Sequence, residues 1–77
     1  MQVRLQVMGH LREYFPRYAE PAAVEVAEPA TVRAALLAAG IPPELPGSVL
    51  VGGMRVRPEH LLAAGDTLQV LSPLAGG

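Results

Sequence analysis

Apolar and polar residues alternate along three segments of the chain, and each alternation predicts a β-strand. Residues 2–8 (QVRLQVM) carry valine or leucine at every second position, with mostly polar residues between them. Residues 22–27 (AAVEVA) and 67–72 (TLQVLS) show the same period of two. Because successive side chains of a strand point to opposite faces, each segment is expected to bury one face. In the last of them, Leu68 and Val70 are expected to face the core.

One clear helix is predicted by the segment PATVRAALLAAG, residues 29–40. Thr31 precedes the apolar positions and can cap the helix, because its hydroxyl accepts hydrogen bonds from the free N–H groups of the first turn. Val32 and Leu36 recur at helical spacing and are expected to face inward. Gly40 follows them and supplies the left-handed conformation that commonly ends a helix.

Turn residues separate the remaining elements. Residues 48–56 (SVLVGGMRV) predict a β-hairpin, since two glycines can take the positive φ that a two-residue primed turn requires. One or two helical turns are expected in residues 10–15 (HLREYF), which Pro16 then stops. Residues 58–66 (PEHLLAAGD) are expected to form a loop with room for one helical turn. The resulting order is typical of an α+β domain, in which one helix lies across one face of a mixed sheet.

The composition narrows the classes of function. The chain has no cysteine, which excludes disulfides, thiolate catalysis and thiolate metal sites. Its net charge of −1 argues against a basic surface that binds nucleic acid. No apolar run approaches the ~18 residues that a membrane-spanning helix needs. His10 and His60 lie far apart in the sequence, so no metal site is expected. The residues after Met1 alternate and do not form an apolar signal core, so a cytoplasmic protein is expected.

Four short motifs carry a family resemblance. They are LRE at 11–13, VLVGG at 49–53, GD at 65–66 and SPLAGG at 72–77. Over its whole length the chain resembles the β-grasp sulfur carriers, the ubiquitin-like family that contains the molybdopterin synthase small subunit (MoaD) and the thiamine-pathway carrier (ThiS). The resemblance implies a five-stranded mixed sheet with one main helix packed on one face. It also implies one β-grasp domain over residues 1–77, whose first and last strands pair in parallel at the sheet centre.

The same resemblance implies that the reactive group is the α-carboxylate of Gly77. A carboxylate is a poor electrophile at neutral pH, so a partner enzyme must convert it to an acyl-adenylate with ATP and magnesium. A sulfur nucleophile then gives a thiocarboxylate, which passes sulfur to an acceptor. The protein is therefore expected to bind no cofactor of its own and not to be catalytic alone. Its expected partners are a ubiquitin-activating-type adenylating enzyme and the large subunit of molybdopterin synthase or an equivalent sulfur acceptor. Binding to nucleic acid or to a membrane is not expected.

The residue types at the end of the chain suit a flexible reactive tail over residues 72–77. Pro73 stiffens the exit from the last strand and lowers the entropy lost when the tail is ordered. Ala75 and Gly76 are small, and glycine lets the backbone approach a partner closely in any conformation. Leu74 is either an apolar anchor in the partner's channel or a residue packed back on its own sheet, and the sequence leaves both open.

The outward face of the sheet is expected to carry a docking patch for these partners. Leu71 alternates with the inward-facing Val70, and a solvated face would favour a polar residue in its place. Apolar residues clustered beside a reactive tail suggest a docking surface, whereas scattered ones are normal on any protein surface. The expected patch comprises Met8, Val56 and Leu71, and its expected rim comprises Arg4, Arg55 and Arg57.

The sequence alone leaves several functions open. The leading hypothesis is the sulfur-carrying small subunit of molybdopterin synthase, and the next is a carrier for thiamine or another cofactor. A ubiquitin-like modifier joined to target lysines through Gly77 is a third, and a non-reactive binding module is a fourth. All six basic residues are arginines, for which genomic base composition is one explanation. A chain without lysine also cannot form conjugates through its own lysines, which fits a carrier or a single-copy modifier.

Overall fold

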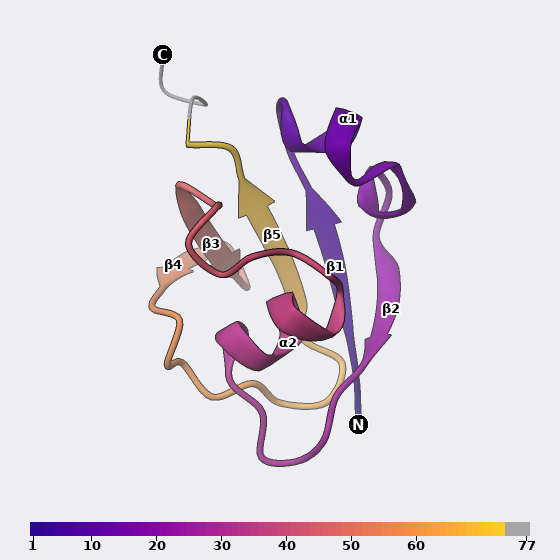
Figure 1. Ribbon diagram of the computed structural model, residues 1–77. Coiled ribbons are helices and arrows are strands. Elements are labelled where there is room, and N and C mark those ends of the chain that lie inside the picture. The colour runs from indigo at the N-terminus through magenta and orange to yellow at the C-terminus, as the bar shows by residue number, and fades with distance from the viewer. Residues whose placement is uncertain (74–77) are drawn as a thin grey trace.

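The structure is a computed structural model, and it describes residues 1–73 (Figure 1). In chain order the strands are β1 (Gln2–Val7), β2 (Ala22–Glu25), β3 (Ser48–Val51), β4 (Met54–Val56) and β5 (Thr67–Leu71). The helices are α1 (Leu11–Tyr14), a short 3-10 helix (Pro16–Tyr18) and α2 (Val32–Ala38). Within these residues no helix combines the length and the apolar character that crossing a bilayer requires.

The five strands form one mixed sheet in the order β2-β1-β5-β3-β4. The central strands β1 and β5 run parallel, with Leu5 opposite Leu68, and every other neighbouring pair is antiparallel. This arrangement confirms the predicted fold, including the parallel pairing of the first and last strands. The period of two is confirmed as well, because the side chains of Val3, Leu5 and Val7 are all buried.

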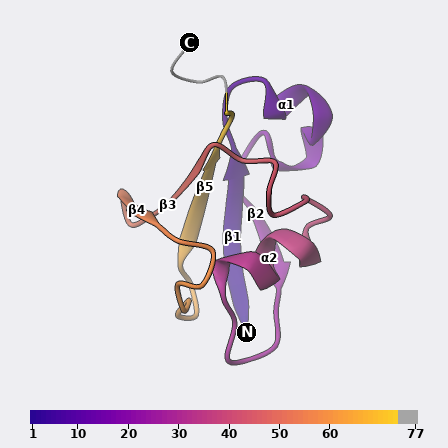
Figure 2. The ribbon, with the colours of Figure 1, turned by 60° about the vertical axis from the view of Figure 1, so that its left-hand side comes forward.

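Helix α2 covers one face of the sheet and closes the core (Figure 2). Its start is capped as predicted, since the Thr31 hydroxyl accepts a hydrogen bond from the Ala34 N–H at 3.1 Å. Val32 and Leu36 are buried against the sheet. Gly40 has a φ of +80° and ends the helix, which confirms its expected left-handed conformation. The apolar stripe of α2 and the inward faces of the strands therefore form one core.

The connections also follow the predicted pattern, with two differences. The hairpin turns at two glycines of positive φ, and β2 ends at Glu25, two residues before its predicted end. Residues 58–66 contain no helical turn and run as a loop along the start of α2. Backbone bonds hold this loop there, from the Val32 N–H to the His60 carbonyl and from the Leu62 N–H to the Ala30 carbonyl.

Candidate functional site

The chain leaves the sheet at the end of β5, beside α1 (Figure 1). Two backbone bonds fix the last residues of this strand, from the Met8 N–H to the Val70 carbonyl and from the Gly47 N–H to the Leu71 carbonyl, both 2.8 Å long. Ser72 is then buried and Pro73 is exposed. We call Ser72 and Pro73 the tail root. The sites predicted at Leu74, Ala75, Gly76 and Gly77 lie outside the described residues and stay predictions.

Two glycines pack against the tail root. A Cβ atom placed on Gly47 would lie 2.6 Å from the Cα of Pro73 and 2.9 Å from the carbonyl oxygen of Ser72. On the other flank, a Cβ on Gly9 would lie 3.3 Å from the Cβ of Ser72. Gly47 therefore lets the loop before β3 pass closer to the tail root than any other residue type allows. Sequence reasoning missed this contact, because residues 47 and 73 come together only through the pairing of β3 with β5.

The outer face of the sheet, opposite α2, carries part of the predicted docking patch. Leu71 lies there as predicted, because it follows the fully buried Val70 and is itself only half-buried. It pairs with Ser48 on β3. Met8 comes directly after the buried Val7 at the end of β1, and it too is half-buried. The structure thus brings Met8 and Leu71 to the end of the sheet from which the tail leaves.

Val56 does not belong to this patch, and its predicted facing is wrong. Val56 lies opposite Val49, and Val49 lies opposite the buried Val70. Residues directly opposite each other on neighbouring strands share a face, so Val56 points to the helix side of the sheet. There it is half-buried and packs against the core.

The three arginines of the expected rim lie in different places. Arg55 occupies an outward position of β4, since it pairs with Leu50 and alternates with Val56, although its side chain also reaches the edge of a hollow beside the hairpin. Arg4 is also on the outer face, but it lies four residues before Met8, about 13 Å along the strand. Its guanidinium Nη2 donates to the Pro21 carbonyl at 3.5 Å, away from the patch. Arg57 follows β4, and both Arg55 and Arg57 are among the lining residues of that hollow, which lies on the helix side.

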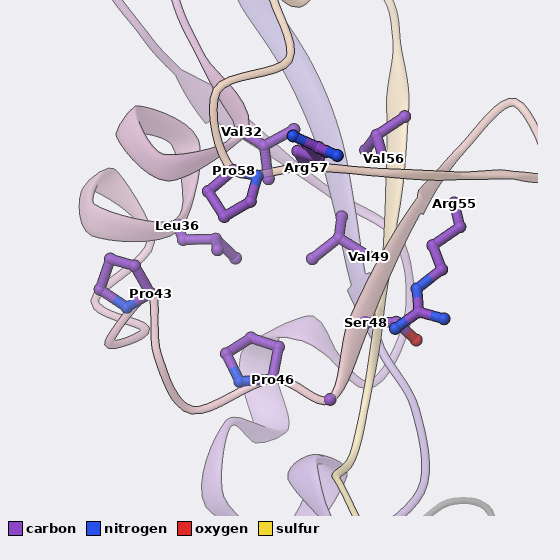
Figure 3. A pocket seen from close by; sticks show the side chains of 11 residues that line it. Val32, Leu36, Pro43, Pro46, Ser48, Val49, Arg55, Val56, Arg57 and Pro58 are labelled. Carbon is purple, nitrogen blue, oxygen red and sulfur yellow. The ribbon is translucent and has the colours of Figure 1, made fainter.

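This hollow lies between α2, the proline-rich loop and the β3–β4 hairpin, and it has a volume of about 450 Å³. Leu36 and Val49 point toward one another across it, and Pro43, Pro46 and Pro58 lie around it (Figure 3). No carboxylate or histidine is among its lining residues, so it offers no general acid or base. Over residues 1–73, moreover, no three histidine, aspartate or glutamate side chains are grouped so that they could hold a metal ion.

A pair of substitutions tests the facing of these strands. Leu71→Arg is expected to change the free energy of unfolding by less than about 1 kcal/mol, as is usual for a position outside the core. Val56→Arg is expected to lower it by about 1–2 kcal/mol, since complete burial of an apolar side chain contributes roughly 1.5–3 kcal/mol and Val56 is half-buried. Denaturant unfolding of both variants measures the difference. Equal losses would contradict the packing of Val56, and not of Leu71, against the core.

Leu71→Arg has a second expected effect. It should weaken binding to a partner that docks on the outer face, because the new charge would be desolvated in an apolar contact. Titration of the variant against that partner measures this effect. Unchanged affinity would show that the outer face is not used.

Comparison with known proteins places this geometry in a family. The family model described as Mut7-C ubiquitin matches residues 1–74. A crystal structure of SAMP1 from Haloferax volcanii covers 100% of both chains at 26% identity, with a TM-score of 0.78. A second crystal structure, of H. volcanii small archaeal modifier protein 1, covers 95% of this chain and 98% of its own at 25% identity, with a TM-score of 0.76. No curated protein matches the chain.

A third solved structure bears on the fold alone. The putative molybdopterin converting factor, subunit 1, from Pyrococcus furiosus is 18% identical, with a TM-score of 0.75. The match covers 96% of this chain and 99% of that one. Together these matches confirm the predicted ubiquitin-like β-grasp and its relation to the fold of the sulfur carriers. With the family model covering nearly its whole length, the chain belongs to the Mut7-C ubiquitin family.

Proposed function

We propose that the protein is a ubiquitin-like sulfur carrier whose working group is the α-carboxylate of Gly77. One observation carries the proposal. In a ubiquitin-like fold, the central strand β5 leads through an exposed Pro73 to a sequence that ends four residues later in Gly76-Gly77. We assign the chemistry to the tail and to a partner enzyme.

The proposed reaction uses the carboxylate in two steps. An adenylating enzyme of the ubiquitin-activating type joins Gly77 to AMP, with ATP as its own substrate, magnesium as its own cofactor and release of pyrophosphate. Sulfide (HS⁻) from the sulfur source then attacks the acyl carbon, forms the C–S bond and displaces AMP, which leaves a thiocarboxylate and releases a proton. The two glycines suit this chemistry, because the absence of Cβ atoms lets a narrow channel close around the backbone.

The specific acceptor that we propose is the large subunit of molybdopterin synthase, with this chain as the small subunit. The LRE motif after β1 supports this assignment, and so does a fold shared with a putative molybdopterin converting factor subunit. A thiamine-pathway or other cofactor acceptor fits the same tail chemistry. Activating enzymes and acceptor proteins are the classes of partner that the ubiquitin-like fold suggests.

A second candidate function is protein modification through Gly77. Two observations favour it: the likeness to small archaeal modifier protein 1 over 95% of the chain, and the absence of lysine. A modifier without lysine is added as a single unit, because no conjugate can be extended through its own side chains. Both functions begin with the same adenylate and differ in the nucleophile that consumes it.

Intact mass measurement tests the proposal and separates the two candidates. The protein is incubated with the adenylating enzyme of the same cells, ATP, magnesium and a sulfur source. A sulfur carrier should gain the mass difference of sulfur replacing oxygen, located in the last peptide, and the gain should require ATP. A modifier should instead appear in branched peptides, linked through Gly77 to lysines of other proteins. An unchanged mass with an active enzyme, and no branched peptide, would contradict both.

A further inference from the structure

A small apolar groove opens beside the tail root. It has a volume of about 380 Å³, and its lining includes Leu11 and Phe15 from the region of α1, Leu45 from the proline-rich loop, and Pro73. Leu11 is buried at its base and Phe15 packs against the core, so the groove has a firm floor. No carboxylate or guanidinium side chain is among its lining residues, and His10 is its one titratable lining group besides Tyr14. We call it the tail-root groove.

The tail-root groove gathers exposed apolar surface. Five large apolar side chains are exposed in the described chain, and two of them, Tyr14 and Leu45, line this groove. Tyr14 is 75% exposed although it is the largest of the five. Exposed tyrosines with an apolar neighbour are typical of the anchors that dominate protein–protein binding. The other three, Leu37, Met54 and Leu61, do not line it.

The position of the groove indicates what covers it. Pro73 lines the groove, and four residues separate Pro73 from the end of the sequence. Four residues span at most about 13–14 Å when fully extended. An enzyme that holds the Gly77 carboxylate in its active site must therefore bring its surface within that distance of the groove. A second copy of this chain seated in the groove would obstruct that approach.

We propose that the tail-root groove receives an apolar side chain of the adenylating enzyme, from the surface around the channel that takes the tail. This inference rests on the proposed function, and it adds to that function the surface that the adenylating enzyme recognises. Docking here buries apolar walls without desolvating a charged lining residue, so it incurs little of the cost that a polar groove would impose. It also anchors the domain beside its tail, which shortens the segment that must be ordered in the channel.

A matched pair of double variants tests the groove. Tyr14→Ser with Leu45→Ser removes its exposed walls, while Met54→Ser with Leu61→Ser removes two exposed apolar side chains elsewhere. In ATP–pyrophosphate exchange with the adenylating enzyme of the same organism, the groove variant should raise the KM for the protein by about tenfold or more, typical of losing binding anchors. Its kcat should change little, and the control variant should keep both constants. Thermal unfolding of both variants checks that neither loses the fold.

The outcomes separate this inference from the proposed function. An unchanged KM in the groove variant, or an equal rise in the control, overturns the groove as a docking site while adenylation of the wild-type chain stands. A wild-type chain that supports no exchange overturns the proposed function itself. If sedimentation shows a dimer of the wild-type protein that the groove variant loses, the occupant is a second copy, and the assignment to the enzyme is wrong.

Discussion

Deletion of Gly77 is expected to abolish adenylation and to leave the fold intact. The deletion moves the carboxylate back by one residue, up to about 3.3–3.6 Å along an extended chain. Reacting atoms must approach to about 3–3.5 Å with aligned orbitals, so a displacement of that size prevents the terminal carboxylate from attacking ATP. ATP–pyrophosphate exchange measures the loss. Thermal unfolding should not change, because a terminal residue beyond the last strand contributes little to stability.

Gly76→Val is the control that separates the position of the carboxylate from the shape of the tail. It keeps the chain length, and thus the reach of the carboxylate, but adds a branched side chain where the proposed channel closes around bare backbone. Exchange activity should fall steeply without a change in stability. Full exchange activity in the chain that lacks Gly77 would contradict the assignment of its carboxylate as the working group. A large loss of stability in either variant would show that the tail packs on its own domain.

The elements that sequence reasoning predicted are those with a strong local signal. The first strand alternates perfectly over residues 2–7, so its buried face could be read directly. The helix has a start signal at Thr31 and a stop signal at Gly40, and both act in the structure as the sequence indicates. Adjacent glycines likewise predicted the hairpin turn at Gly52 and Gly53. These features depend on a few neighbouring residues, which is why the sequence suffices for them.

The facing of Val56 could not be predicted in the same way. Three consecutive apolar residues form most of β3, so a period of two does not say which of them points inward. The choice is made by register, because Val49 lies opposite Val70 on β5 and opposite Val56 on β4. Register between strands far apart in the sequence is a tertiary property. The same holds for the tail-root groove, whose walls Tyr14 and Leu45 lie in separate segments.

Gly47→Ala is expected to destabilise the protein and to displace the tail root. The new Cβ would lie 2.6 Å from the Cα of Pro73, so backbone must move on one side or the other. Overpacking of this kind costs about 1–3 kcal/mol. A domain of this length has roughly 4–12 kcal/mol of stability in total, so the loss is substantial. Each kcal/mol should lower the Tm by about 4–8 °C, which thermal unfolding can measure.

A double-mutant cycle shows whether the tail root is the cause. In a chain that ends at Leu71, the atoms that the new Cβ would meet are absent, so Gly47→Ala should cost no more than about 0.5 kcal/mol there. Gly52→Asn is the matched glycine control, because nothing lies within 4 Å of a Cβ at Gly52 and asparagine tolerates its φ of +59°. It should change stability by less than about 0.5 kcal/mol. If Gly47→Ala costs the same in the full and shortened chains, the contact with Pro73 is not what requires glycine. If the cost disappears with the tail root, the close contact of Gly47 with Ser72 and Pro73 is what requires glycine at this position.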